Sequence, residues 1–371
     1  MDAYIASVPV HLLNAMQMVK QNQIKDCDLY YVPTSNNADE LLRAVSETGV
    51  FNTVTMLPNI NIEYPVTIKQ CIKIALNRFG ARKQINNKNY NTVYYNTDGW
   101  LLNSIIYSSL PNKKSKNIFI ENGINPYITP YDEKEWYLRL FINCNLMTCM
   151  DGRFIDERYV FEPTLISVPQ SGEIHCINKI DRNDELLKKQ VNKIFGYDES
   201  KDSFNDKNII IMEQGPRKEP IDMVGLWNRV SQYIDKRDVI VKSHPRQKQS
   251  ALRELGFDMY ERYTIPWEVL TFNQNMNDKT LLCIFSTSCT NPKLMFDEEP
   301  RVIMLYKLIG IDYSFFGKGM IDFVEGVGKL YRDKDKFFIP ESWEELEEYC
   351  CKHNLQGGKY ENSCVNTNQD E

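Results

Sequence analysis

Residues 208–212 (Asn-Ile-Ile-Ile-Met) and 238–242 (Asp-Val-Ile-Val-Lys) are two short apolar runs rich in β-branched residues, which is typical of buried strands. Between them, residues 221–234 have the apolar spacing of a helix. A strand, a helix and a second strand in this order predict a parallel βαβ unit. The sequence around this unit repeats the pattern, so we expect the α/β fold class.

The same alternation extends in both directions from this unit. Towards the C-terminus we expect strands at 281–285 and 301–305 and helices at 249–255, 291–296 and 343–353. Towards the N-terminus we expect strands at 4–8, 29–32, 53–57, 92–95 and 117–120, and helices at 11–20, 38–45, 68–79, 100–109, 133–150 and 185–195. Two separate series of alternating strands and helices predict two Rossmann-like domains.

A polar stretch poor in core residues, 197–207, separates the two series and is interpreted as a linker. We therefore expect an N-terminal domain over 1–196, a C-terminal domain over 208–355 and a disordered polar tail over 356–371. Ligands of open α/β sheets bind at the carboxyl ends of the strands. This predicts an active site in the cleft between the domains.

The net charge, the apolar segments and the cysteines of the chain indicate which partners, location and bound groups to expect. The chain of 371 residues has a formal net charge of −6, which argues against nucleic acid as the main partner. It has no basic, apolar leader and no run of the roughly 20 apolar residues that a membrane span needs, so we expect a cytoplasmic protein. Peripheral association with the inner face of the cell membrane, and a homodimer, stay open. The ten cysteines form no CxxC pair and no zinc-like spacing, and we expect neither a metal nor a cofactor.

Three polar motifs follow predicted strands. In the first, Ile118-Phe119-Ile120-Glu121-Asn122-Gly123, a carboxylate stands at the end of an apolar strand and a glycine permits a tight turn. Glu121 could take a proton from an attacking sugar hydroxyl. The alternative is a carboxylate that only caps the loop.

The second motif, Lys242-Ser243-His244-Pro245-Arg246, places three basic side chains after a β-branched strand. Pro245 biases the backbone of His244 towards extended conformations. The cluster suits a donor phosphate, with His244 able to give the leaving phosphate a proton or a hydrogen bond. The alternative is a surface turn.

The third motif, Ser286-Thr287-Ser288, joins an apolar strand to a predicted helix. Hydroxyls and the free N–H groups at a helix start can bind an anion. The alternative is a simple N-cap, in which Ser288 or Thr290 satisfies the start of the helix. Together with the His-Pro turn, this motif predicts a phosphate pocket.

At these residues the chain resembles bacterial sialyltransferases of glycosyltransferase family 52 and the related capsule polysialyltransferases. Those enzymes share an acidic-acidic-Gly motif, a His-Pro motif and a Ser-Ser/Thr motif in this order, here Glu121-Asn122-Gly123, His244-Pro245 and Ser286-Thr287-Ser288. The opening at 8–15 and the segment at 292–296 are also similar. The resemblance spans residues 4–308.

The resemblance implies a GT-B fold and metal-independent transfer with inversion. It implies that Glu121 is the catalytic base, that His244 acts on the departing CMP phosphate and that the Ser-Thr-Ser run contacts it. It also implies a carboxylate on the cytidine ribose, which we assign to Glu268 in Ile265-Pro266-Trp267-Glu268. Lys242 and Pro245 complete the expected donor site.

One departure from the family pattern concerns the base. The second acidic position is Asn122, which leaves one carboxylate there. The family also draws a base from the loop after the first strand of the C-terminal domain, which here holds Glu213. Glu213 is therefore the reserve base.

The expected function is a sialyltransferase that moves sialic acid from CMP-sialic acid to a terminal sugar, galactose by preference, of a surface glycan such as lipooligosaccharide or capsule. Its partners are then a nucleotide-sugar donor and an oligosaccharide acceptor. Two alternatives stay open: a transferase of the same fold for another nucleotide sugar, such as a glucosyltransferase, and a catalytically silent subunit of glycan assembly.

Overall fold

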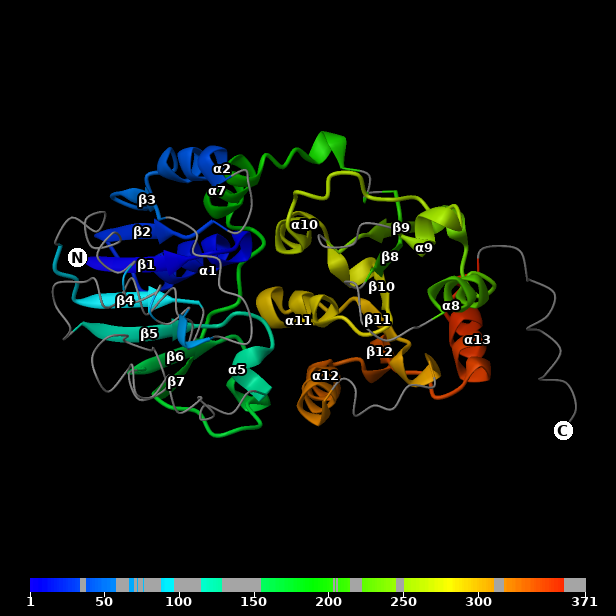
Figure 1. Cartoon of the computed structure of the whole chain (residues 1–371). Coiled ribbons are helices and arrows are strands. Elements are labelled where there is room, and N and C mark those ends of the chain that lie inside the picture. The colour runs from blue at the N-terminus through cyan, green and yellow to red at the C-terminus, as the bar shows by residue number, and fades with distance from the viewer. Residues whose placement is uncertain are drawn as a thin grey trace, which may run out of the picture. The chain divides into compact units, whose positions relative to one another are not determined.

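The structure is a computed structural model that describes residues 1–33, 38–57, 67–69, 72, 76, 88–96, 115–128, 155–202, 204, 206–213, 222–244, 250–309 and 317–356. The chain divides into two compact units, Met1–Tyr197 and Asp198–Glu371. Each unit is built around its own sheet (Figure 1).

The first unit contains a seven-stranded sheet in the order β3-β2-β1-β4-β5-β6-β7. Its strands are β1 (Asp2–Ala6), β2 (Cys27–Tyr31), β3 (Val54–Met56), β4 (Thr92–Tyr95), β5 (Lys116–Ile120), β6 (Glu157–Val160) and β7 (Glu173–Cys176). Every pair of neighbours is parallel. The first six strands follow the Rossmann order, in which the order of the strands in the sheet reverses between β1 and β4.

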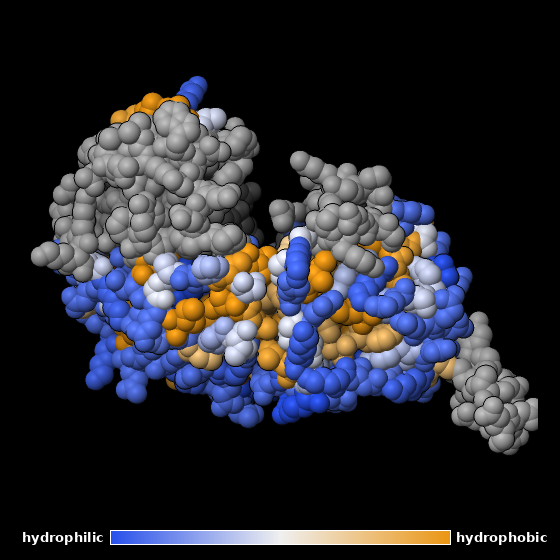
Figure 2. Space-filling view, turned by 90° about the horizontal axis from the view of Figure 1, so that it is seen from below, coloured by the Kyte–Doolittle hydropathy of each residue, from blue (hydrophilic) through white to orange (hydrophobic). Residues whose placement is uncertain are grey.

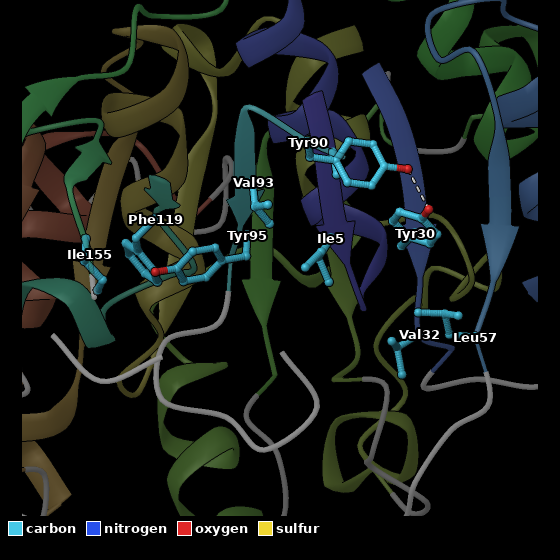
Figure 3. Close-up of a cluster of buried hydrophobic side chains, with 10 residues drawn as sticks. Ile5, Tyr30, Val32, Leu57, Tyr90, Val93, Tyr95, Phe119 and Ile155 are labelled. Carbon is cyan, nitrogen blue, oxygen red and sulfur yellow. Dashed lines mark hydrogen bonds between the residues drawn. The ribbon is translucent and has the colours of Figure 1, made fainter. Parts of the chain in front are cut away.

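One face of this sheet carries an aromatic core. Because side chains alternate between the two faces of a strand, Ile5, Val93, Tyr95 and Phe119 point the same way and form a buried cluster (Figure 3). Tyr95 and Phe119 meet edge to face, with ring centroids 5.9 Å apart. Burial on this scale stabilises the sheet, since each fully buried large apolar side chain contributes about 1.5–3 kcal/mol.

The described helices of the first unit are α1 (Pro9–Gln21), α2 (Ala38–Ser46), α5 (Asn125–Ile128), α7 (Glu185–Phe195) and the short 3-10 helix η2 (Pro163–Leu165). Helix α1 packs on β1, and α2 packs on α7 and β3. Asp184 begins α7 by accepting a hydrogen bond from the Leu187 N–H, and Gly196 ends it in the left-handed conformation.

The second unit contains a five-stranded parallel sheet in the order β12-β11-β10-β8-β9. Its strands are β8 (Ile209–Met212), β9 (Val239–Lys242), β10 (Thr280–Cys283), β11 (Arg301–Met304) and β12 (Phe337–Phe338). The strands β8 to β11 are almost entirely buried, as expected for a parallel sheet covered on both faces. Here the order reverses between β8 and β10, which is the second common doubly wound topology.

The described helices of the second unit are α8 (Met223–Val230), α9 (Ala251–Glu254), α10 (Trp267–Asn273), α11 (Asn291–Phe296), α12 (Lys318–Leu330) and α13 (Trp343–Lys352). Its 3-10 helices are η3 (Glu199–Lys201), η4 (Lys236–Asp238), η5 (Met276–Asp278), η6 (Thr287–Thr290), η7 (Tyr306–Ile309) and η9 (Lys334–Lys336). Side chains of Asp222 and Ser342 cap the N-termini of α8 and α13.

Most elements predicted in the described residues are present within a few residues of their predicted bounds, and the two strand orders confirm two Rossmann-like domains of the α/β class. The strands β6, β7 and β12 and the helices α5, α10 and α12 were not predicted. The predicted helices at 100–109 and 133–150 and the tail beyond residue 356 lie outside the described residues, and of the helix predicted at 68–79 only Ile68, Lys69, Ile72 and Leu76 are described, all helical.

Part of the stretch interpreted as a linker belongs to the second unit. Phe204 is fully buried, and the centroid of its ring lies 4.4 Å from the centroid of the Tyr260 ring. The ammonium of Lys279 donates a hydrogen bond to the Phe204 carbonyl at 3.2 Å.

The surface carries both hydrophilic and hydrophobic residues (Figure 2). Hydrophilic residues predominate on the face that Figure 2 shows, and hydrophobic areas are visible on both units. None of the helices in the described part of the chain combines the length and the apolar character that a membrane span requires.

Candidate functional site

The strand order of the first unit reverses between β1 and β4, and ligands of doubly wound sheets bind at the carboxyl ends of the strands beside such a reversal. Polar residues follow the strands at this edge: Ser7 after β1, Asn96 after β4 and Glu121 after β5. We call these residues, with His11, Asn14 and Asn122, the β1–β4–β5 edge. It is the candidate catalytic edge of this unit.

Glu121 is buried at this edge, with 5% of its surface exposed. Its Oε2 accepts hydrogen bonds from the Tyr127 hydroxyl at 2.5 Å and from the Phe161 N–H at 2.7 Å. Its Oε1 has no hydrogen-bond partner among the described residues. Burial raises the pKa of Glu121 to about 7, although both hydrogen bonds and the charge of Lys179 oppose the rise. A carboxylate with this pKa can accept a proton near neutral pH.

The backbone of Glu121 is held from two neighbouring strands. Its carbonyl accepts hydrogen bonds from Nδ2 of Asn14 at 3.1 Å and Nδ2 of Asn96 at 3.2 Å. Gly123 has a φ of +62°, a conformation that favours glycine, and it turns the chain into α5. These contacts fix the direction in which the Glu121 side chain leaves the sheet.

His11 lies at the same edge, at the start of α1, and is 1% exposed. Burial lowers its pKa to about 4, and the side chain of Asn122 partly opposes this shift. Nδ1 accepts a hydrogen bond from the Ser7 N–H at 3.2 Å. The neutral imidazole therefore carries its proton on Nε2, where it is a donor.

The second unit has a corresponding edge, because its strand order reverses between β8 and β10. Glu213 follows β8, Lys242 ends β9 and leads to His244, and Ser286 comes three residues after β10. We call this the β8–β9–β10 edge. The structure thus brings the predicted donor residues to one edge, with Glu268 on the nearby helix α10, and places Glu121 in the other unit.

Glu213 is buried next to Lys242. Its N–H donates to the Lys242 carbonyl at 3.0 Å, which continues the pairing of β8 with β9. Its Oε1 accepts a hydrogen bond from the Ser250 hydroxyl at 2.6 Å, and its Oε2 is buried with no partner among the described residues. A buried carboxylate oxygen in this state is a candidate acceptor for a substrate group.

The ammonium of Lys242 is buried and donates to the Ile265 carbonyl at 3.0 Å, 5.0 Å above the centre of the Tyr260 ring. Burial lowers the pKa of Lys242 to about 8, and the carboxylates of Glu268 and Asp202 oppose the shift. The group keeps most of its positive charge at neutral pH. The ammonium adds positive charge to this edge, while its own hydrogen bond goes to a backbone carbonyl of the protein.

Glu268 and the hydroxyl run are connected through helices α10 and α11. Oε1 of Glu268 accepts from Asn291 Nδ2 at 2.9 Å, and burial raises the pKa of this carboxyl. The Trp267 indole donates to the Ser288 carbonyl at 2.8 Å. Ser286 caps η6 by accepting from the Ser288 N–H at 3.3 Å, whereas Thr290, at the start of α11, makes no side-chain cap. Thr287 and Ser288 follow inside η6, and all three hydroxyl residues are partly exposed.

His244 is half-buried just beyond β9. Pro245 and Arg246 lie outside the described residues.

Several residues of the two edges were missed in the sequence. They are His11, Asn14, Asn96, Tyr127, Ser250 and Asn291. Asn96 had a usable signal, since it directly follows a predicted strand as Glu121 does. Tyr127 had none, because its hydroxyl reaches Glu121 only through the turn at Gly123.

One described cluster could hold a metal ion: Glu157, Glu173 and His175 place one ligand atom each within 4.8 Å of one another. It lies on β6 and β7, and both carboxylates stand at the amino ends of these strands, opposite to the β1–β4–β5 edge. The ammonium of Lys116 already pairs with Glu157. We assign no role in catalysis to this cluster.

No protein-family model matches the sequence, and no curated protein matches it. Among solved structures, the chain is similar to a UDP-glucosyltransferase from Polygonum tinctorium in complex with 3,4-dichloroaniline, with 9% identity over 94% of each chain and a TM-score of 0.48. It is also similar to Arabidopsis thaliana UGT89C1 complexed with UDP-L-rhamnose, with 10% identity over 96% of this chain and 95% of that one and a TM-score of 0.41. TcCGT1 in complex with UDP matches with 8% identity over 95% and 90% of the two chains and a TM-score of 0.46. The assignment of two Rossmann-like domains rests on the strand orders themselves.

Proposed function

We propose that this chain is a glycosyltransferase of the GT-B class that transfers sialic acid, with inversion and without a metal, from CMP-sialic acid to a terminal sugar of a surface glycan. The observation that carries the proposal is Glu121, a buried carboxylate with a pKa of about 7 beside the reversal of the first sheet. A group poised near the working pH is suited to general base catalysis.

In the proposed reaction, the acceptor hydroxyl loses its proton to Glu121 as its oxygen bonds to the anomeric carbon of the donor. The bond from that carbon to the phosphate oxygen of CMP breaks, and the electron pair leaves on the phosphate. His244 meets the developing charge with a hydrogen bond or a proton. The positive charge of Lys242 and the hydroxyls of Ser286, Thr287 and Ser288 support the same phosphate.

The assignment of CMP-sialic acid as the donor rests on the amount of negative charge that the leaving nucleotide carries. CMP leaves with a single phosphate, which one histidine, one ammonium and a few hydroxyls can balance. We assign Glu268 to the ribose and keep Glu213 as the reserve base. Both residues have partners within the second unit, Asn291 and Ser250, that orient their carboxylates.

The test is a thermal-shift screen with CMP, UDP, GDP and ADP, with and without magnesium. A bound ligand raises the apparent stability by mass action, by about 2.7 kcal/mol at a hundred times its dissociation constant. We expect CMP to raise the melting temperature most and without magnesium, and CMP-sialic acid to be turned over. A larger shift with UDP that requires magnesium would instead indicate a transferase for another nucleotide sugar. No shift with any nucleotide would indicate a catalytically silent subunit.

A further inference from the structure

We propose that Tyr127 is a positioning residue for the transfer: it fixes Oε2 of Glu121, so that Oε1 is the oxygen that takes the proton of the acceptor hydroxyl. This inference rests on the proposed function and adds to it the atom that acts as base and the residue that selects this atom.

The hydrogen bonds of Glu121 are divided unequally between its two oxygens. Oε2 accepts both the Tyr127 hydroxyl and the Phe161 N–H, whereas Oε1 has no partner among the described residues. The Tyr127 hydroxyl has a fixed direction, because its oxygen accepts the Glu162 N–H at 3.3 Å while its hydrogen goes to Glu121. A hydroxyl that accepts from one group and donates to another cannot rotate freely.

Tyr127 is itself held rigidly. Its side chain is fully buried, and it belongs to the short helix α5 that follows the Gly123 turn. Its carbonyl accepts two hydrogen bonds from Ser167, from the N–H and from the hydroxyl, both at 3.0 Å. A side chain anchored through its backbone and its hydroxyl can orient a neighbouring carboxylate without touching the substrate.

The charged and titratable groups around Glu121 come from several elements. Besides Tyr127, they are Lys179, whose charge lowers the pKa of Glu121, and Glu162, whose charge raises it. The charge of Glu121 also raises the pKa of Cys176. Burial is the largest influence and raises the pKa, and the Tyr127 hydrogen bond is the largest influence that lowers it. Removing the Tyr127 hydroxyl should therefore make Glu121 a weaker acid.

The step that this arrangement serves is balanced. The acceptor O–H bond breaks and an Oε1–H bond forms, while the acceptor oxygen bonds to the anomeric carbon and the bond from that carbon to the nucleotide phosphate breaks. No oxidant, reductant or further reactant is required. Oε2 stays in its two hydrogen bonds throughout.

The experiment compares the pH dependence of kcat for the wild type and Tyr127→Phe, with the full chain and CMP-sialic acid as donor. We expect the acid limb of the variant to move to higher pH by about one unit, because a hydrogen bond to a carboxylate is worth roughly one pKa unit or more. At pH ~7 this corresponds to a fall in kcat of about fivefold, with recovery at alkaline pH and little change in the KM of the acceptor.

Tyr90→Phe is the matched control. Tyr90 is also a buried tyrosine whose hydroxyl donates to a buried carboxylate, that of Asp28, at 2.6 Å (Figure 3 shows Tyr90). It precedes β4 and therefore lies at the amino end of the same sheet. Its replacement should lower stability but leave the pH profile of kcat in place.

A second substitution keeps the test decisive if Tyr127→Phe does not fold. Replacing Tyr127 by 3-fluorotyrosine keeps the shape and makes the phenol a stronger donor, so the acid limb should move to lower pH. An active wild type whose acid limb does not move in either Tyr127 variant would overturn the role of Tyr127 alone. A wild type that turns over no nucleotide sugar would overturn the proposed function, and this role with it.

Discussion

At the scale of single residues, the structure gives Glu121 two properties that no pattern around it in the sequence indicates, namely burial and an unequal set of partners. Burial disfavours the charged carboxylate and raises its pKa to about 7. The same burial makes the residue costly for the fold at higher pH. Suitability as a base and a cost in stability therefore have one physical cause.

The first prediction concerns this cost. Because the pKa of Glu121 is raised in the folded state from 4.5 to about 7, its contribution is fully present below about pH 4.5 and is lost as the pH rises to about 7. The difference amounts to about 3 kcal/mol, since each pKa unit corresponds to about 1.4 kcal/mol. Glu121→Gln should remove this slope from the free energy of unfolding, measured by urea denaturation between pH ~4 and ~8.

The control for this measurement is Glu40→Gln, since Glu40 is an exposed carboxylate on α2 of the same unit. That variant should keep the slope of the wild type because Glu121 is unchanged. If Glu121→Gln also keeps the slope, the carboxyl ionises in the folded protein near its ordinary pKa.

At the scale of elements, the strands that carry the candidate site are the ones with the clearest patterns. Strands β8, β9 and β10 are buried and mostly apolar, with Lys242 at the end of β9 and Thr280 at the start of β10. Strands β6 (Glu-Arg-Tyr-Val) and β7 (Glu-Ile-His-Cys) carry charged and polar residues, and β7 lies at the edge of the sheet. A polar edge strand has little apolar periodicity, so it escaped detection.

Helix α12 shows why a helix can also be missed. It contains three glycines, which have low helix propensity, and one of them, Gly328, is required by packing. A Cβ atom at Gly328 would lie 2.7 Å from Cδ1 of Phe337 on β12. The close approach of α12 to β12 therefore requires a glycine at position 328, and that glycine lowers the helix propensity of α12.

The second prediction tests this contact. Gly328→Ala gains about 1 kcal/mol of helix propensity, but overpacking against the ring costs roughly 1–3 kcal/mol, so we expect a net loss of stability. Phe337→Leu should remove the clash, and the double variant should be more stable than the sum of the two single changes predicts. Chemical denaturation of the four proteins measures the coupling. Additive effects would show that Gly328 has no packing role.

At the scale of the whole molecule, the proposed roles are divided between two units, each with its own core and its own polar edge. The N-terminal unit holds Glu121 and the C-terminal unit holds Glu213, Lys242 and His244. The identity of the base can therefore be tested separately from the binding of the nucleotide.

The third prediction uses this separation. Glu121→Gln should abolish transfer and leave the CMP-induced rise in melting temperature at the wild-type value, because an amide accepts no proton near neutral pH and the donor residues are unchanged. Glu213→Gln should keep most of the transfer rate. The opposite outcome, an active Glu121→Gln and an inactive Glu213→Gln, would move the base to Glu213, whose Oε2 is buried with no partner among the described residues.

Local patterns in the sequence are enough to establish the α/β class, the two series of strands and helices, and the position of polar motifs directly after strands. Apolar periodicity predicts the elements, and the carboxyl ends of parallel strands must meet at one edge. For that reason the sequence predicts that Lys242, His244 and Ser286 lie at one edge of a sheet, and the structure places β9 and β10, which precede them, on either side of β8.

The contacts that give these residues their chemistry depend on tertiary packing. The raised pKa of Glu121 depends on its burial and on the Tyr127 hydroxyl, and the hydrogen bond from Lys242 to the Ile265 carbonyl joins residues far apart in the chain. The neutral state of His11 likewise comes from its burial. Burial and hydrogen bonds between distant segments are set by how the elements pack, and no local pattern in the sequence encodes them.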